Sequence, residues 1–172
     1  MKFFSGFCLK NDKKFFKEYL EEGLVVAGFS KGAQEALDYV LTSKERVDKL
    51  QLFSPAFFNY SEKIIEMNLQ AFKKDKDSYI KNFLIKAGAI LENGKWKIEN
   101  EYLEIGECNI VDLEKLFTFD WEKIKQIQDV KIEVFLGEFD KIIALKKARD
   151  FFKNYADIYF FNKSNHFLRR AN

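Results

Sequence analysis

Three residues of this 172-residue sequence carry the side chains needed for nucleophilic attack by a hydroxyl group: Ser30, Asp140 and His166. A serine hydroxyl is a weak nucleophile until a base takes its proton, and the usual base is a histidine that a carboxylate orients. His166 is the single histidine of the chain. We therefore predict that Ser30 is the nucleophile and that His166 acts as general base and then as general acid. Asp140 is predicted to hold the imidazole tautomer and to stabilise its positive charge.

The serine stands in a G-x-S-x-G pattern formed by residues 28–32. An apolar run, residues 24–27, precedes the pattern, and apolar residues at helical spacing follow it. This context indicates a strand, a sharp turn that carries the serine, and a helix, with Gly28 and Gly32 where strand and helix crowd together. The alternative is a glycine-rich turn whose serine merely caps the helix.

The acid and the base each follow a predicted strand. Asp140 ends the sequence Gly-Glu-Phe-Asp, and His166 lies in a loop directly after the last strand. The order Ser, Asp, His is the one found when these groups lie at the strand ends of an α/β hydrolase sheet. Asp140 has a second reading as the N-cap of a helix that starts at Lys141, and Glu138 is a competing acid.

A tetrahedral intermediate also needs two N–H donors for its oxyanion. The backbone of Lys31, directly after the serine at the helix start, is predicted to supply one. For the second donor we choose Phe7, in the turn Ser5-Gly6-Phe7 that ends the first strand.

The elements that position these residues alternate between strands and helices. Strands are expected at residues 2–7, 24–27, 49–53, 131–136 and 156–161, and helices at about 13–20 (capped by Asn11 or Asp12), after Gly32 and around 145–152. This alternation predicts an α/β fold with a mainly parallel sheet and right-handed crossovers. Sites in such sheets form beyond the carboxyl ends of the strands.

Residues 56–128, called the insertion below, break this rhythm. They contain four helical stretches, two of which are expected to start at Asp112 and Asp120, and a polar Asn93-Gly94 turn before a short strand or hairpin arm at 95–99. We interpret the insertion as a mostly helical lid over the active edge of the sheet. An ordinary helical layer within a single domain, residues 1–172, is the alternative.

Composition limits the remaining possibilities. A formal net charge of +2 gives no sign of nucleic-acid binding. The start of the chain is too short for a membrane span and lacks a small-residue cleavage site, so we expect a cytoplasmic monomer that does not bind membranes. The two cysteines, Cys8 and Cys108, are expected to stay reduced. One histidine and two distant cysteines make no usual zinc set, and we predict neither a metal nor a cofactor.

The residues quoted above resemble the α/β-hydrolase superfamily. Residues 28–32 match its nucleophile elbow, 137–140 its acid loop and 165–166 its histidine loop, while Ser5 stands where the family's oxyanion turn usually has histidine. The chain also starts at what corresponds to the family's third strand. This compactness resembles the short pimeloyl-ACP methyl ester esterases of biotin synthesis. That resemblance implies hydrolysis of the methyl ester of pimeloyl-ACP, with an acidic acyl carrier protein as partner.

Further residues are expected to meet such a substrate. The aromatic residues expected to line an apolar tunnel are Phe29, Phe117, Trp121 and Phe139, although ordinary core is the alternative in a chain with twenty Phe. Residues 73–86 hold five lysines against two aspartates, a net charge of +3. The residues expected to dock the carrier are Lys73, Lys74, Lys76, Lys81, Arg169 and Arg170. The competing functions are a general short-chain carboxylesterase or thioesterase and an inactive hydrolase-fold binding module.

Overall fold

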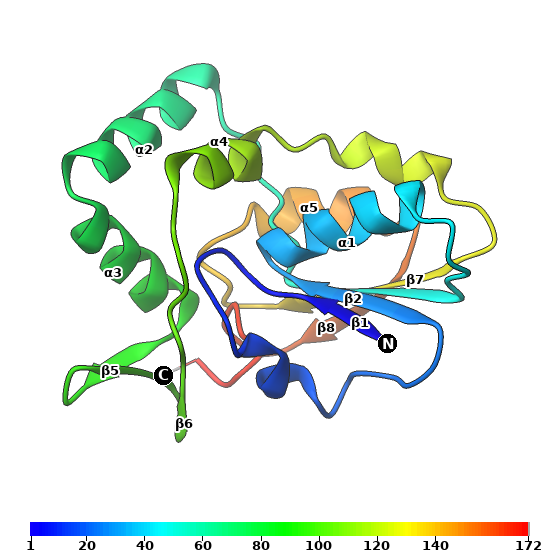
Figure 1. The fold of residues 1–172 in the computed structure, drawn as a ribbon, viewed down its shortest axis with the longest axis horizontal. Coiled ribbons are helices and arrows are strands. Elements are labelled where there is room, and N and C mark those ends of the chain that lie inside the picture. Colours follow the sequence, from blue (N-terminus) through cyan, green and yellow to red (C-terminus); the bar gives the residue numbers. More distant parts are fainter. Residues whose placement is uncertain (172) are drawn as a thin grey trace.

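A computed structural model of the chain describes residues 1–171, with five strands in one parallel sheet (Figure 1). Their order across the sheet is β1, β2, β3, β7, β8, and every neighbouring pair runs parallel. The strand bounds are β1 Lys2–Phe4, β2 Val25–Phe29, β3 Lys49–Phe53, β7 Lys131–Gly137 and β8 Asp157–Phe161. The predicted α/β class with a parallel sheet is confirmed.

Helical elements cover both faces of this sheet. The helices α1 (Lys31–Thr42) and α5 (Leu145–Phe152) lie on one face with the short 3-10 helix η2 (Trp121–Gln126) (Figure 1). Phe15 and Phe16 of the 3-10 helix η1 (Asp12–Phe16) pack on the other face against Phe29 and Phe53. Because the central strands are apolar on both sides, each face buries its own hydrophobic cluster.

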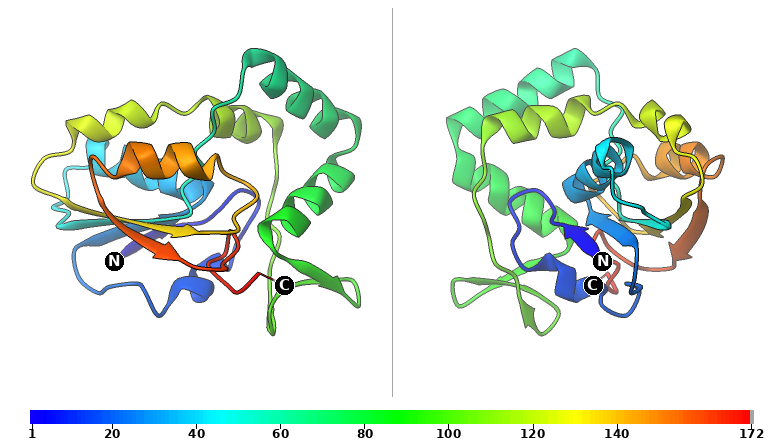
Figure 2. Two further views of the ribbon diagram at one scale, coloured as in Figure 1. Left: turned by 180° about the vertical axis from the view of Figure 1, so that it is seen from behind. Right: turned by 45° about the vertical axis from the view of Figure 1, so that its right-hand side comes forward.

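Most of the insertion stands beside the sheet, past the carboxyl ends of the strands (Figures 1 and 2). It comprises α2 (Glu62–Lys74), α3 (Lys76–Ala87), a small antiparallel sheet and α4 (Ile110–Thr118). The small sheet joins β4 (Ile90–Glu92), β5 (Lys95–Ile98) and β6 (Glu101–Tyr102), with Asn93-Gly94 in its first turn. The end of the insertion, η2, instead packs in the helical layer with α1, and a lid role for the rest of the insertion stays a prediction.

Helix capping differs from the prediction at two places. The helix expected at 13–20 is only the 3-10 turn η1, because the side chains expected to cap it bind elsewhere. Asn11 accepts a hydrogen bond from the Glu104 amide (2.9 Å), and Asp12 accepts one from the Gly6 amide (2.8 Å). The cap of α4 is Asn109 and not Asp112, whose amide donates to Asn109. Asp120 caps η2 as predicted.

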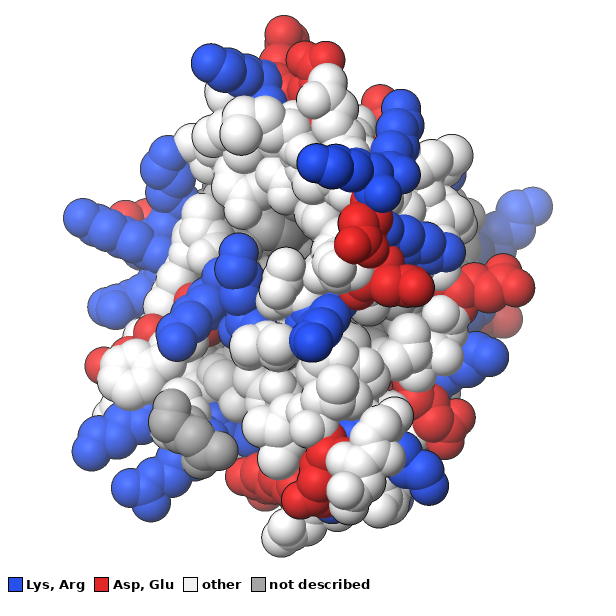
Figure 3. Space-filling view, turned by 90° about the vertical axis from the view of Figure 1, so that its left-hand side faces the viewer, with Lys and Arg blue, Asp and Glu red and all other residues white. Residues whose placement is uncertain are grey.

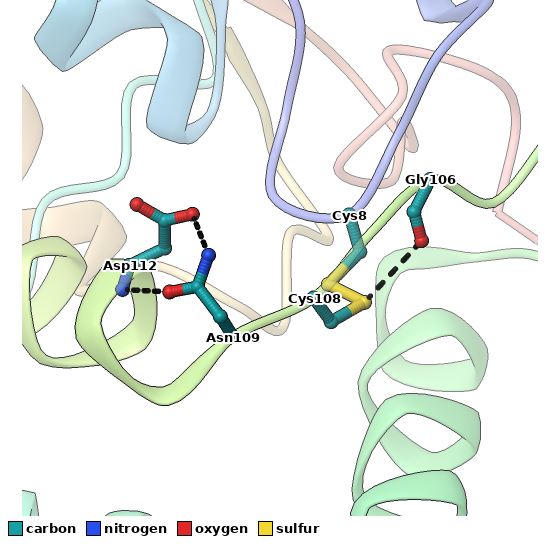
Figure 4. Close-up of a disulfide and its surroundings, with 5 residues drawn as sticks. All are labelled: Cys8, Gly106, Cys108, Asn109 and Asp112. Carbon is teal, nitrogen blue, oxygen red and sulfur yellow. Dashed lines mark hydrogen bonds between the residues drawn. A yellow bond between two sulfur atoms is a disulfide. The ribbon is translucent and has the colours of Figure 1, made fainter.

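The expectation that both cysteines stay reduced is wrong, because Cys8 and Cys108 form a disulfide (Figure 4). The bond joins the turn after β1 to the segment that leads into α4, so it ties the insertion to the sheet. Disulfides are rare in the cytosol, which also weighs against the expected cytoplasmic location. Within residues 1–171, no helix is long and apolar enough to cross a membrane, and no cluster of metal-ligating side chains occurs.

The Cys8→Ser, Cys108→Ser double variant is expected to lose about 2–4 kcal/mol of unfolding free energy, because the disulfide closes a loop of 100 residues. Urea denaturation measures the loss. Dithiothreitol should destabilise the wild type by a similar amount and leave the double variant unchanged. Two titratable thiols in the untreated native protein would refute the disulfide.

Candidate active site

Ser30 occupies the sharp turn between β2 and α1. Its backbone has φ 54° and ψ −113°, a conformation that residues other than glycine rarely adopt. Only 1% of the residue is exposed to solvent. The Ser30 amide donates to the Phe53 carbonyl (2.9 Å), and the Ser30 carbonyl accepts from Ala33 (3.1 Å). The Ser30 side chain makes no capping hydrogen bond to α1. The alternative of a serine that merely caps the helix is therefore not supported.

The two glycines of the elbow allow the backbones to approach each other closely. A Cβ atom on Gly28 would lie 2.1 Å from the Gly32 carbonyl oxygen, and one on Gly32 would lie 2.1 Å from the Phe4 carbonyl oxygen. Since both obstacles are backbone atoms, no side-chain rotation relieves them. Strand β2, helix α1 and the end of β1 therefore meet only with glycine at these positions.

Gly32→Ala is expected to destabilise the fold by about 3 kcal/mol or more, at the upper end of overpacking effects. Thermal and urea unfolding measure this change. Gly106→Ala is the matched control, because a Cβ atom there meets the flexible Lys10 side chain at 3.1 Å and the Cys8 carbonyl oxygen only at an ordinary contact distance of 3.7 Å. Equal stability of the two variants would contradict the close packing at the elbow.

Asp140 and His166 form a buried acid–base pair. Asp140 Oδ2 lies 2.6 Å from His166 Nδ1, and both side chains are completely shielded from solvent. Asp140 Oδ1 accepts hydrogen bonds from the Ile142 and Ile143 amides, but the alternative of a helix that starts at Lys141 is wrong, because α5 begins at Leu145 with Ala144 as its N-cap. Glu138 instead accepts from the Lys163 amide (2.7 Å). Of the two acids, the structure therefore brings Asp140 to the imidazole.

The loops that carry this pair are held against each other. A Cβ atom on Gly137 would lie 2.4 Å from the Asn165 carbonyl oxygen, so β7 and the histidine loop touch through their backbones. The Phe139 amide donates to the Ser164 carbonyl (2.8 Å). The Asn165 side chain accepts from the Phe167 amide (2.9 Å) and so shapes the turn around His166.

Ser30 follows β2 and His166 follows β8, so both residues lie at the edge formed by the carboxyl ends of the parallel strands. The ring of Phe29, the residue before Ser30, lies 4.9 Å from the imidazole between ring centroids. Ser30 Oγ and His166 Nε2 are both buried, and neither has a hydrogen-bond partner among residues 1–171. These are the two atoms between which a catalytic proton would be transferred. They do not hydrogen-bond to each other in the structure, and no other group in the described part of the chain binds them.

The predicted oxyanion donors belong to the turn after β1 and to the start of α1. No hydrogen bond from the Phe7 or Lys31 amide is formed within the described chain. The Gly6 amide, in contrast, is bound to the carboxylate of Asp12, and Leu9 closes the same turn by donating to the Gly6 carbonyl (3.1 Å). The turn is thus fixed by neighbours of Phe7 and leaves its amide available.

Asp12 is a residue of this site that the sequence did not reveal. It is completely buried, and burial raises the pKa of its carboxyl group, while the hydrogen bond from Gly6 acts in the opposite direction. Because Asp12 directly precedes residues 13–16, the sequence predicted a helix cap and not a hydrogen bond to the Gly6 amide. No feature of the sequence signals that this acid, the first residue of η1, is buried.

A cavity of about 210 Å³ lies between the insertion and the loops of the sheet. Phe7 and Ile142 line it from the side of the sheet. The insertion contributes aromatic and apolar side chains, among them Phe58, Tyr60, Tyr79, Phe83, Leu116 and Phe117. Burial raises the pKa of Tyr79 to about 12, so this phenol is neutral and donates a hydrogen bond to Asn68 (2.9 Å).

The structure separates the four aromatic residues predicted to line a tunnel. Phe117 lines the cavity. Phe29 packs under the imidazole, within the core. Trp121 is buried on the other face of the sheet, where its Nε1 donates to the Ala56 carbonyl (3.0 Å). Phe139 is 46% exposed and lines a second cavity. Phe29 and Trp121 are therefore core residues.

The basic residues predicted to dock a carrier also differ in their surroundings. Arg169 contacts Glu18 and donates to the Phe15 carbonyl (2.6 Å). It is therefore paired within the chain and is not a free cation beside the active site. Arg170 is exposed and lines the second cavity. The lysines of α2 and α3 are exposed, namely Lys73, Lys74, Lys76 and Lys81.

Comparison with solved structures finds proteins of similar fold. An esterase from Exiguobacterium antarcticum superposes with a TM-score of 0.60 at 18% identity, over 83% of this chain and 59% of that one. MenH from S. aureus superposes with a TM-score of 0.59 at 12% identity, over 95% of this chain and 85% of that one. The fold is that of the α/β-hydrolases.

A third α/β-hydrolase match is a thermophilic esterase from Thermogutta terrifontis. It has a TM-score of 0.58 and 13% identity, over 83% of this chain and 57% of that one. The chain thus spans under two thirds of the length of both esterases. No protein-family model matches the sequence, and no curated protein matches it. Identities this low show the fold, and the chemistry must be argued from the site.

Proposed function

We propose that this chain is a serine carboxylesterase with Ser30, His166 and Asp140 as its catalytic triad. The observation that carries the proposal is the buried Asp140–His166 pair beside a serine held at φ 54°. A buried polar atom without a partner costs about 1–3 kcal/mol, and this site keeps two of them, Ser30 Oγ and His166 Nε2. Strained backbone and unpaired groups concentrate at functional sites.

In the proposed mechanism, Ser30 Oγ attacks the ester carbonyl carbon as its proton passes to His166 Nε2. The carbonyl π electrons move to oxygen, and the Phe7 and Lys31 amides bind the resulting oxyanion. Collapse of this intermediate expels the alcohol, which takes the proton from His166. Water then attacks the acyl carbon and gives a proton to His166. Collapse of this second tetrahedral intermediate breaks the acyl–Oγ bond, returns the proton from His166 to Ser30 Oγ and releases the carboxylic acid.

For the substrate, we propose the methyl ester of pimeloyl-[acyl-carrier protein]. The aromatic side chains of the cavity between the insertion and the sheet support an acyl chain at this place, although Asn68 and Asn82 also line it. The exposed lysines of α2 and α3 support docking of an acidic partner, an attraction that added salt would weaken. With Arg169 internally paired, the docking surface proposed here consists of Lys73, Lys74, Lys76, Lys81 and Arg170, all of which are exposed.

One observation favours a general short-chain esterase as the second candidate. The cavity of about 210 Å³ is smaller than the roughly 300–1,000 Å³ typical of pockets for drug-sized ligands. Such a volume suits a short acyl chain or a single aromatic ring better than a long chain on a carrier arm.

Incubation with pimeloyl-ACP methyl ester, followed by mass spectrometry of the carrier, tests the substrate. We expect free pimeloyl-ACP with the wild type and none with Ser30→Ala. Comparable rates on free short-chain methyl esters would favour the second candidate. No turnover of any ester would reject both.

A further inference from the structure

Two lysines stand between the aromatic cavity and its neighbour. The second cavity, of about 220 Å³, lies next to the first and is lined by residues of α3, the small sheet and the histidine loop. Lys86 and Lys141 are the residues that line both cavities. They approach from opposite sides, because Lys86 lies in the last turn of α3 and Lys141 directly follows the catalytic acid.

The surroundings of these two lysines are positively charged. The first cavity has no aspartate or glutamate in its lining. The second adds Arg170 and one acid, Glu99, whose carboxylate lies 3.9 Å from the Arg169 guanidinium. Figure 3 shows this side of the molecule, where blue Lys and Arg side chains stand around a hollow.

No ion pair neutralises either lysine within residues 1–171. The nearest acids in sequence are already committed, since Asp140 binds His166 and two amides, and Glu138 binds the Lys163 amide. An ammonium group without a carboxylate partner, beside a cavity with aromatic side chains in its lining, is suited to an anion whose uncharged part enters that cavity.

We propose that Lys86 and Lys141 bind a negatively charged group of the substrate, a carboxylate or a phosphate, and thereby select anionic esters over neutral ones. This inference rests on the proposed esterase activity. The anion has two chemical sources: a carboxylate at the far end of the acyl chain, or a phosphate on the alcohol. In either case the uncharged chain occupies the aromatic cavity.

Two matched substrate pairs distinguish these sources. Monomethyl adipate and methyl hexanoate differ by a carboxylate on the acyl chain, and 1-hexanoyl glycerol 3-phosphate and 1-hexanoyl glycerol differ by a phosphate on the alcohol. Two partly screened ion pairs predict that kcat/KM for the anionic member exceeds that of its neutral partner by about tenfold in at least one pair.

The Lys86→Ala, Lys141→Ala double variant should lose this preference, so that kcat/KM for the anionic member falls to about that of its neutral partner. Lys147→Ala is the control, because this exposed lysine of α5 lines neither cavity. No preference in either pair, or a preference that survives the double substitution, would overturn the anion site while leaving the esterase proposal intact.

Binding to the inactive Ser30→Ala variant separates the two proposals. Titration calorimetry should detect monomethyl adipate or the phosphate ester with Ser30→Ala and much weaker binding when both lysines are also replaced. If the wild type hydrolyses no ester but this lysine-dependent binding is found, the anion site stands and the esterase proposal fails. Absence of both would overturn the two together.

Discussion

Ser30→Ala is expected to lower kcat/KM for ester hydrolysis by about 10⁴-fold or more, as removal of a triad nucleophile does in other serine hydrolases. The same variant should unfold at nearly the wild-type temperature. The Ser30 hydroxyl is buried without a hydrogen-bond partner among the described residues, so its removal leaves no other group unpaired. Steady-state kinetics and thermal unfolding on one preparation measure both effects.

Ser54→Ala is the matched control for this variant. Ser54 also ends a parallel strand, has positive φ (40°), and has a buried hydroxyl without a hydrogen-bond partner within residues 1–171. It differs in lacking the context of an elbow followed by a helix. We expect Ser54→Ala to retain activity. Equal losses in the two variants, or an inactive Ser30→Ala that is also unfolded, would count against a catalytic serine.

Asp140→Asn is expected to reduce kcat by about 10⁴-fold, the effect of the same change in other triads. An asparagine oxygen at the Oδ1 position keeps the hydrogen bonds from the Ile142 and Ile143 amides. The amide nitrogen then faces His166 Nδ1, where it donates and forces the imidazole into the wrong tautomer. Activity is therefore lost although the loop keeps its shape.

Glu138→Gln serves as the control for the competing acid. Its side-chain oxygen still accepts from the Lys163 amide, and it makes no contact with the imidazole in the structure. Hydrolysis should continue at the wild-type rate. An inactive Glu138→Gln together with an active Asp140→Asn would show that the acid is assigned to the wrong residue.

The sequence was sufficient for those parts of the site that local backbone chemistry determines. The G-x-S-x-G pattern requires small residues where β2, α1 and β1 converge, and the structure shows Gly28 and Gly32 against backbone atoms. The predicted strand at 49–53 agrees with β3. Asp140 and His166 follow neighbouring parallel strands, so their proximity follows from the order of the sheet.

Long-range contacts were not predictable in the same way. Nothing near Cys8 in the sequence indicates that Cys108, 100 residues later, reaches it, because the path of the insertion decides that pairing. The sequence does not distinguish a Trp121 that lines a tunnel from a Trp121 that packs in the core. Asp12 satisfies a helix-start pattern, and only the fold shows that its carboxylate holds the Gly6 amide.

The proximity of Lys86 and Lys141 was also not predictable from the sequence. Lys86 belongs to a run of lysines on α2 and α3 that suggests a solvated surface, and Lys141 looks like the first residue of a capped turn. Their common feature is that both side chains line the same two cavities. This follows only from the packing of the insertion against the loop that holds Asp140.

Labelling with a fluorophosphonate tests the proposed triad most directly, because the reagent requires an activated serine and no knowledge of the substrate. We predict that mass spectrometry finds one modified residue, Ser30, in the wild type and no modification in His166→Ala under the same conditions. An unmodified wild-type Ser30, or equal labelling of Ser30 without His166, would contradict the proposed proton relay and favour an inactive hydrolase fold.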